Sequence, residues 1–234
     1  MKSSEFAERL VTLIEARKGV FANKLNIEDW VPSELDNVGK SNFLFYLTQI
    51  DYATKSTLLY EGAQNLYSLN NRFFTPSYIS KTNKVFLKKT MEQYLKPRYI
   101  NEAALRYKVN TEKLNKLYMG NPLKIFSSSD AEDVLQKIWE FRGFGPKTGN
   151  LFFRAIVTTF NLRLNNIEKV MQPVDIHDVR IAKFMGYIEE DCMTDENIRE
   201  VKNVWSKACK EADVNWLTFD KALWILGSVG KPKS

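Results

Sequence analysis

The chain has 234 residues and a formal net charge of +6, from 34 Lys and Arg against 28 Asp and Glu. Hydrophobic residues make up 44% and charged residues 26%, which is the usage of a globular protein and not of a disordered chain. Two cysteines are too few for a disulfide framework, a four-cysteine zinc site or a four-cysteine iron–sulfur cluster. The modest basic excess favours a polyanionic partner; a solvated basic surface without a partner is the alternative.

No part of the sequence resembles a targeting or membrane segment. Residues 1–9 lack the apolar region of a signal peptide. The most apolar stretch, residues 43–50, is interrupted by Thr48 and Gln49 and is far too short to span a membrane. We therefore expect a soluble intracellular protein, cytoplasmic or nucleoid-associated, with no membrane contact.

Apolar residues recur at helical spacing along nearly the whole chain, as Leu10, Leu13 and Ile14 do in the first segment. The sequence contains no Asn-Gly or Asp-Gly dipeptide of the kind that closes β-hairpins. An all-α fold is predicted, and the polar residues 161–172 are expected to form a connecting loop. In chain order, the expected helices cover residues 4–18, 40–50, 52–68, 77–94, 98–107, 111–119, 130–142, 147–160, 176–187, 195–212 and 217–227.

The segment between two of these helices, Phe141–Asn150, reads FRGFGPKTGN. Gly143 and Gly145 permit a tight turn that leaves backbone N–H groups uncovered, and Pro146 suits the first position of a helix. A row of free N–H groups at a helix N-terminus binds anions, and for a basic chain a nucleic-acid phosphate is the obvious one. The alternative is an ordinary turn in which glycine serves only the backbone.

The run GFGPKTG at residues 143–149 resembles the helix-hairpin-helix signature of the DNA glycosylase superfamily typified by endonuclease III. Downstream, PVDIHDVR at residues 173–180 is similar to the second signature of that superfamily. The two signatures occur in the right order, and the detailed match covers residues 141–186. The resemblance implies two helical lobes with a central cleft. Residues 1–40 with 161–234 would form the terminal lobe, and residues 41–160 the helical-barrel lobe, with the hairpin at about 130–160.

The resemblance also implies an activity, that of a bifunctional DNA glycosylase and AP lyase of base excision repair. Lys147 falls on the position of the catalytic lysine and Asp175 on that of the catalytic aspartate. A lysine attacks the sugar only as a neutral amine, which requires roughly 4 kcal/mol of preference for that form. A helix dipole supplies at most about 2 kcal/mol, so desolvation must supply the rest. The alternatives are a lysine that only contacts phosphate and an aspartate that only caps a helix.

The implied partner is double-stranded DNA containing a damaged base, bound by a monomer. No metal or organic cofactor is expected, although a monovalent cation at the hairpin carbonyls fits the resemblance. Lys147 and Asp175 are 28 positions apart, more than in endonuclease III, and the C-terminal cysteine cluster of that enzyme is missing. Both departures resemble the archaeal 8-oxoguanine DNA glycosylases, so 8-oxoguanine is the expected lesion. The alternatives are an endonuclease III-like activity on oxidised pyrimidines and a non-catalytic nucleic-acid-binding protein.

Further residues receive expected roles from the same comparison. Gln49 resembles the residue that fills the space left by a flipped base, and the alternative is an ordinary polar residue at a helix end. Arg142, Arg154 and Lys183 flank the two signatures as phosphate contacts, and Cys192 and Cys209 are expected to be buried thiols. The other expected DNA contacts are Gly143, Gly145, Thr148, His177 and Arg180. The expected base-pocket aromatics are Phe144, Trp216 and Trp224, for each of which a place in the core is the alternative.

Overall fold

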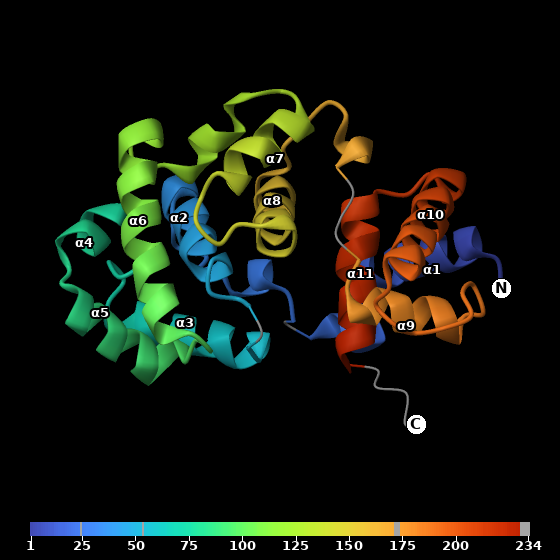
Figure 1. The fold of residues 1–234 in the computed structure, drawn as a ribbon, viewed down its shortest axis with the longest axis horizontal. Helices are drawn as coiled ribbons and strands as arrows, with labels where there is room; N and C mark the ends of the chain where they lie inside the picture. Colours follow the sequence, from blue (N-terminus) through green and yellow to red (C-terminus); the bar gives the residue numbers. More distant parts are fainter. Residues whose placement is uncertain (24, 53, 171–173, 230–234) are drawn as a thin grey trace. The chain divides into compact units, whose positions relative to one another are not determined.

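The computed structural model describes residues 1–23, 25–52, 54–170 and 174–229, and over these ranges it contains helices and no β-strand (Figure 1). The predicted all-α class is confirmed. The α-helices are α1 (Ser3–Glu15), α2 (Asn37–Thr48), α3 (Ser56–Leu69), α4 (Pro76–Lys81), α5 (Lys84–Thr90), α6 (Ile100–Tyr118), α7 (Ala131–Trp139), α8 (Pro146–Phe160), α9 (Ile176–Phe184), α10 (Asp195–Ala212) and α11 (Trp216–Val229).

Short helical segments of other types connect them. A π-helical segment, η3 (Met91–Leu95), continues α5. The 3₁₀ segments are η1 (Gly19–Ala22), η2 (Ile27–Trp30), η4 (Pro122–Ser127) and η5 (Ile167–Lys169).

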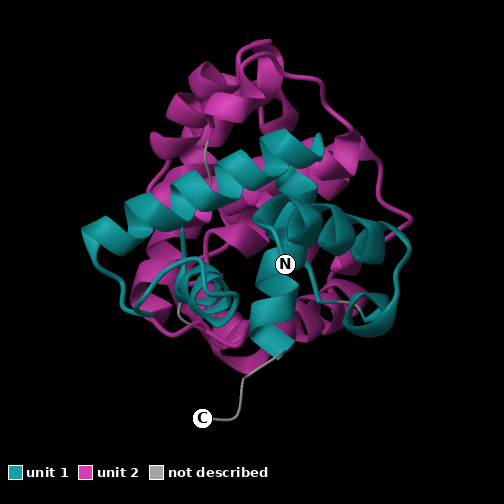
Figure 2. Ribbon diagram, turned by 90° about the vertical axis from the view of Figure 1, so that its right-hand side faces the viewer, with its two compact units in different colours: residues 1–26, 171–234 teal, residues 27–170 magenta. Residues whose placement is uncertain are grey.

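The chain divides into two compact units, coloured separately in Figure 2: Met1–Asn26 with Met171–Ser234, and Ile27–Val170. In the smaller unit, α1 packs along α10 and α11, and α9 packs on α11. Its core is apolar and is centred on Phe6, Trp205 and Phe219, whose rings contact one another.

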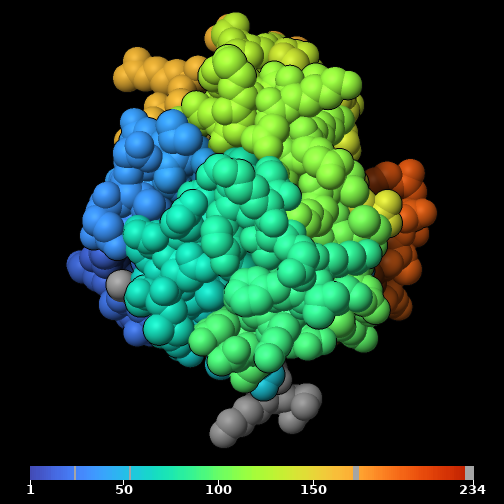
Figure 3. Space-filling model, turned by 90° about the vertical axis from the view of Figure 1, so that its left-hand side faces the viewer, coloured from blue at the N-terminus to red at the C-terminus, as the bar shows by residue number. Residues whose placement is uncertain are grey.

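The larger unit is built around α2. Every residue from Ser41 to Thr48 is buried, as expected for a helix that is covered on all sides. This helix packs against α8, and the hydroxyl of Tyr46 lies 2.6 Å from the hydroxyl of Thr111 on α6. Figure 3 shows the side of this unit that carries α4 and α5, away from α8.

The unit boundaries differ from those of the expected lobes. Residues 27–40 and 161–170 belong to the larger unit and not to the terminal one. The first segment is held there by η2, where Glu28 accepts a hydrogen bond from Thr158 of α8 at 3.1 Å. The second is held by Asn165, which exchanges backbone hydrogen bonds with Ser129 and Ala131 at 2.7 and 3.0 Å. Long-range polar contacts, which local sequence patterns do not reveal, therefore set both boundaries.

Two predicted helical regions were wrong in detail. The expected helix 77–94 is divided into α4, α5 and η3, because Asn83 caps a new helix by accepting from the Phe86 amide at 2.8 Å. The expected helices 98–107 and 111–119 form the single helix α6. Asn110, which lies between the two expected ranges, is fully buried in mid-helix and is paired with other elements.

Candidate functional site

Helices α7 and α8 are joined by a short turn, as the sequence predicts. Asp130 caps α7 by accepting from the amides of Glu132 and Asp133 at 3.0 and 3.1 Å. Gly143 has φ +81°, a conformation that favours glycine, and α8 begins at Pro146 with Gly145 as its N-cap. The result is a hairpin of two helices, defined here as residues 131–160.

A buried amide on α6 fixes the turn of this hairpin. Asn110 Oδ1 accepts from the Arg142 amide at 2.9 Å, and Asn110 Nδ2 donates to the Arg142 carbonyl at 3.0 Å. The same Nδ2 donates to Gln49 Oε1 at 2.9 Å, and Gln49 Nε2 donates to the Phe45 carbonyl at 3.0 Å. Gln49 is fully buried. The expectation that its side chain enters the DNA stack is therefore wrong for this structure, since the amide is committed to holding α2, α6 and the turn together.

An ionic group lies on the outer side of the same turn. Glu102 accepts two hydrogen bonds from Arg142, at 3.0 and 3.1 Å, and one from Arg106 at 3.0 Å. Arg106 also donates to the Gln49 carbonyl at 2.9 Å. A Cβ at Gly143 would lie 2.5 Å from the Arg106 guanidinium, so a larger residue at this position would require that side chain to move. These contacts lower the pKa of Glu102, chiefly through the hydrogen bond from Arg142.

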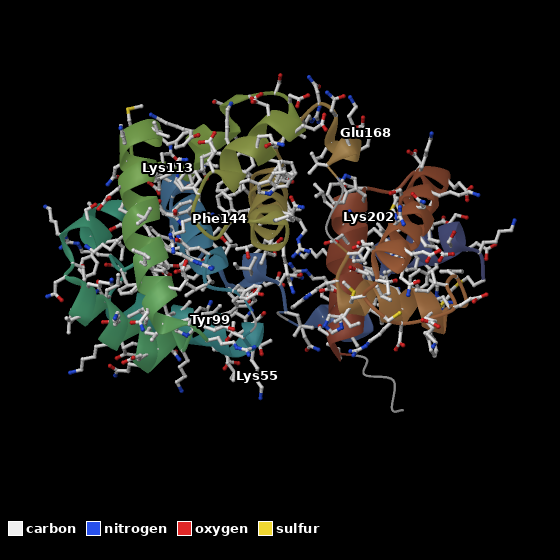
Figure 4. All side chains as sticks on the ribbon, in the orientation of Figure 1. Lys55, Tyr99, Lys113, Phe144, Glu168 and Lys202 are labelled. Atoms are coloured by element: carbon white, nitrogen blue, oxygen red, sulfur yellow. The ribbon has the colours of Figure 1, made fainter. Side chains whose placement is uncertain are left out.

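Aromatic packing anchors the hairpin from inside. Phe144 is 1% exposed and stacks on Phe45 of α2 with ring centroids 5.3 Å apart, and it also contacts Phe141 and Phe152. Phe144 and Lys113 are both labelled in Figure 4. Lys113 of α6 donates from its Nζ to the Glu140 carbonyl, just after α7, at 3.0 Å. The expected role of Phe144 as a base-pocket residue is therefore wrong: it is a core residue.

The start of α8 presents unpaired backbone donors and a lysine. Among the described residues, the N–H groups of Gly143, Gly145 and Lys147 donate to no protein acceptor, and the first bond of the helix runs from Gly149 to Gly145 at 2.8 Å. Lys147 is exposed. The desolvation expected around its amine is thus not present in the unbound protein. Thr148 is buried, so its side chain does not face solvent as a DNA contact would.

A group of polar side chains lies beside the first turns of α8. Asp51, three residues after the end of α2, accepts from Tyr60 Oη at 2.5 Å and from Ser56 Oγ at 2.8 Å. Burial raises the pKa of Asp51, while the charges of Lys147 and Arg154 act in the opposite direction. Arg154 is 4% exposed, with its Nε 3.9 Å from Glu28, so the expected phosphate contact at Arg154 is wrong. This group was not predicted; the only sequence signal was an acid directly after a buried helix.

Asp175, the second expected catalytic residue, is the N-cap of α9 in the smaller unit. Its Oδ1 accepts from the amides of His177 and Asp178 at 2.7 and 3.3 Å, and Asp178 accepts from the Asp175 amide at 2.7 Å, which completes a capping box. His177 packs closely against Gly227 of α11, where an added Cβ would approach it to 2.5 Å. Arg180 is exposed, and Pro173 lies outside the described residues.

The remaining expected residues also lie in the smaller unit. Trp216 and Trp224 are partly buried against its apolar core. Lys183 is half-exposed, with its amine 3.9 Å from Asp191. Of the two cysteines, Cys209 is buried as expected, whereas Cys192 is exposed, which corrects that expectation.

The described residues contain no group of three or more His, Cys, Asp and Glu side chains arranged to hold a metal ion. No described helix is both long and apolar enough to cross a membrane.

Comparison of the chain with protein-family models finds no match, and comparison with curated proteins finds none either. The residues and their geometry are therefore the basis for any functional conclusion.

Proposed function

We propose that this protein is a bifunctional DNA glycosylase and AP lyase that removes an oxidised base, 8-oxoguanine, from double-stranded DNA as a monomer. The observation that carries the proposal is the start of α8. Free backbone N–H groups on the Gly143–Lys147 turn lie next to an exposed primary amine, so a phosphate bound by the turn brings its deoxyribose close to a nucleophile.

The turn is also rigid, which supports a role in placing DNA. Asn110 hydrogen-bonds to both the amide and the carbonyl of Arg142, and Phe144 packs the turn against Phe45 of α2 from inside. Preorganised backbone donors lose little conformational freedom when they bind a phosphate. Such phosphate contacts fix the position of the DNA on the protein.

The proposed reaction starts when the neutral Lys147 amine attacks C1′ and the bond between C1′ and the base breaks. The base leaves with a proton, and the lysine forms a Schiff base with the opened sugar. Loss of a C2′ proton and departure of the 3′ phosphate complete β-elimination, and water then releases the enzyme. Asp175 is proposed to stabilise positive charge on the sugar and to carry the proton of the lysine.

No metal or organic cofactor enters these steps, and a monovalent cation at the hairpin carbonyls is proposed only as a structural support. The exposure of Lys147 means that bound DNA must exclude the water around its amine. The same exposure favours a second candidate, a non-catalytic nucleic-acid-binding protein in which Lys147 only contacts phosphate.

Borohydride trapping separates these functions. The protein is incubated with a duplex containing 8-oxoguanine and then reduced, with thymine glycol, abasic and undamaged duplexes in parallel. We expect a covalent complex with the 8-oxoguanine and abasic duplexes that is lost in Lys147→Gln and kept in Lys137→Gln, a control on α7. If trapping survives in Lys147→Gln, Lys147 is not the nucleophile. If the thymine glycol duplex is trapped in preference to the 8-oxoguanine duplex, 8-oxoguanine is not the preferred lesion.

The binding-only function makes a different prediction for the same variants. A protein that only binds nucleic acid should form no covalent complex with any duplex. Its binding should depend on salt, and the slope of log K against log salt concentration should become smaller by about one in Lys147→Ala. Duplex binding measured at several salt concentrations therefore completes the test.

A further inference from the structure

The basic excess of the chain is concentrated in one segment, residues 72–98. This segment contains a single acid, Glu92, and seven basic residues, which are Arg72, Lys81, Lys84, Lys88, Lys89, Lys96 and Arg98. Seven positive charges and one negative charge give +6, which equals the net charge of the whole chain. The rest of the chain is therefore neutral, and a polyanion would be attracted to this segment.

The segment forms α4, α5 and η3 on the side of the larger unit that Figure 3 shows. Leu87 of α5 and Met91 of η3 are fully buried and anchor the two elements to the unit. On the outer side of α5, Lys84 and Lys89 are exposed and Lys88 is half-buried. The lysines are thus presented on an anchored helix.

The charges of the segment are not neutralised by neighbouring acids. Elsewhere in the larger unit cations do pair, as Lys113 does with Glu140 at 2.8 Å. Within the described ranges, none of the seven basic residues of the segment forms an ion pair. The guanidinium of Arg72 instead lies over the ring of Tyr78, 6.0 Å from its centroid. The positive charge is therefore available to an external anion.

Two apolar side chains are exposed among the lysines of α5. Val85 is 78% exposed and Phe86 is 48% exposed. Val85 and Lys89 are four residues apart on one helix, so they are neighbours on its surface. A DNA duplex offers phosphates to the lysines, but its bases are stacked inside and cannot cover Phe86. A single strand offers both phosphates and free base faces, and such bases stack on aromatic side chains.

We propose that α5 is a binding surface for single-stranded DNA, on which Phe86 stacks with a base while Lys84, Lys88 and Lys89 contact neighbouring phosphates. This inference goes beyond the proposed function and does not depend on it, because the surface includes neither the hairpin turn nor Lys147. It assigns the basic excess of the sequence to a second nucleic-acid site.

Binding of three labelled probes to the full-length protein, followed by fluorescence anisotropy, tests the stacking. The probes are oligo(dT) of about 16 nucleotides, a strand of the same length built only from abasic sugars, and an undamaged duplex. We expect oligo(dT) to bind about tenfold more tightly than the abasic strand. Phe86→Ala should remove this difference without changing the affinity for the abasic strand. Phe184→Ala, at a phenylalanine of the smaller unit that is 77% exposed, should have no effect.

The salt dependence of oligo(dT) binding tests the lysines. The surface variant carries Lys84→Gln, Lys88→Gln and Lys89→Gln. Each lost phosphate contact to a single strand lowers the slope of log K against log salt concentration by about 0.7, so the slope should become smaller by about two. The control variant carries Lys202→Gln, Lys207→Gln and Lys210→Gln on α10 and should keep the slope of the wild type. Both variants should unfold at the temperature of the wild type, because the changes avoid the core.

Oligo(dT) can also reach the hairpin turn, so Phe86→Ala is measured with and without Lys147→Ala. We expect the same loss of oligo(dT) affinity in both backgrounds. If the loss arises from Lys147→Ala alone, the hairpin turn is the binding site and the surface on α5 is not. Borohydride trapping of the damaged duplex is measured separately, so failure of this inference leaves the proposed function intact.

Three further results would overturn the inference. Equal affinities for oligo(dT) and the abasic strand would show that no base stacks on the protein. Tighter binding of the duplex, lost in the lysine variant and unchanged in Phe86→Ala, would assign the surface to a duplex backbone. Binding of poly-L-glutamate as tight as that of oligo(dT) would assign it to an acidic protein.

Discussion

Asn110 binds the amide and the carbonyl of Arg142 at once, at 2.9 and 3.0 Å, so a single buried side chain of α6 pairs with both backbone polar groups of one residue in the hairpin turn. The turn that presents Lys147 is therefore part of the core hydrogen bonding of the larger unit. Its conformation depends on a residue that lies 32 positions away in the sequence.

Asn110→Ala tests that dependence. The change leaves the Arg142 N–H and carbonyl and Gln49 Oε1 without their partner, and each buried unsatisfied group costs about 1–3 kcal/mol. We expect the free energy of unfolding to fall by about 3 kcal/mol in urea denaturation. Asn115→Ala, on an exposed position of the same helix, should change it by less than about 0.5 kcal/mol. Equal effects from the two variants would show that the Asn110 contacts are not structural.

Substitution of each of the two turn glycines by alanine should change the stability of the protein by different amounts. Gly143 has φ +81°, and a Cβ there would displace the Arg106 guanidinium, whereas Gly145 has φ −86° and open space at its Cβ. Gly143→Ala should therefore destabilise the protein by about 1–2 kcal/mol, and Gly145→Ala should leave its stability nearly unchanged. Thermal unfolding of both variants decides this, and a stable Gly143→Ala would contradict the described backbone.

Glu102 should contribute stability that disappears in acid. Hydrogen bonds from Arg142 and Arg106 lower its pKa below the ordinary value of 4.5. A group whose pKa is lowered by folding contributes stability above its unfolded pKa, and this contribution is lost as the pH falls through the folded pKa. Glu102→Gln should thus lower the Tm at pH 7 but leave it unchanged near pH 2. A constant difference in Tm across this range would refute the ionic contribution.

The two cysteines offer a simple check of burial. Cys192 is exposed, whereas burial raises the pKa of Cys209 to about 12. Only a thiolate reacts with a disulfide reagent such as dithionitrobenzoate, so one thiol should react in the native protein at pH 8 and the second only in denaturant. A count of two fast thiols in the native state would place Cys209 at the surface.

The sequence was sufficient for the helical class and for the hairpin. Apolar spacing indicated α7 and α8 nearly to their observed ends, and Gly143 and Pro146 marked the turn and the helix start. These features depend on backbone preferences and on the periodicity of a single segment, both of which are local. The role of Asp175 as a helix cap was likewise predictable, because a capping acid and its partners lie within three residues.

What the sequence could not determine was which polar residues face each other across segments. Gln49 and Phe144 were expected to contact DNA and are interior, while Asn110, which fell between two expected helices, lies within α6 and binds the turn. Asp51 acquires its partner Tyr60 only when the segment after α2 packs against α3. Local patterns fix where helices form, but burial and hydrogen-bond partners arise from long-range packing, and so the tertiary structure alone decided which side chains hold the turn beside the lysine.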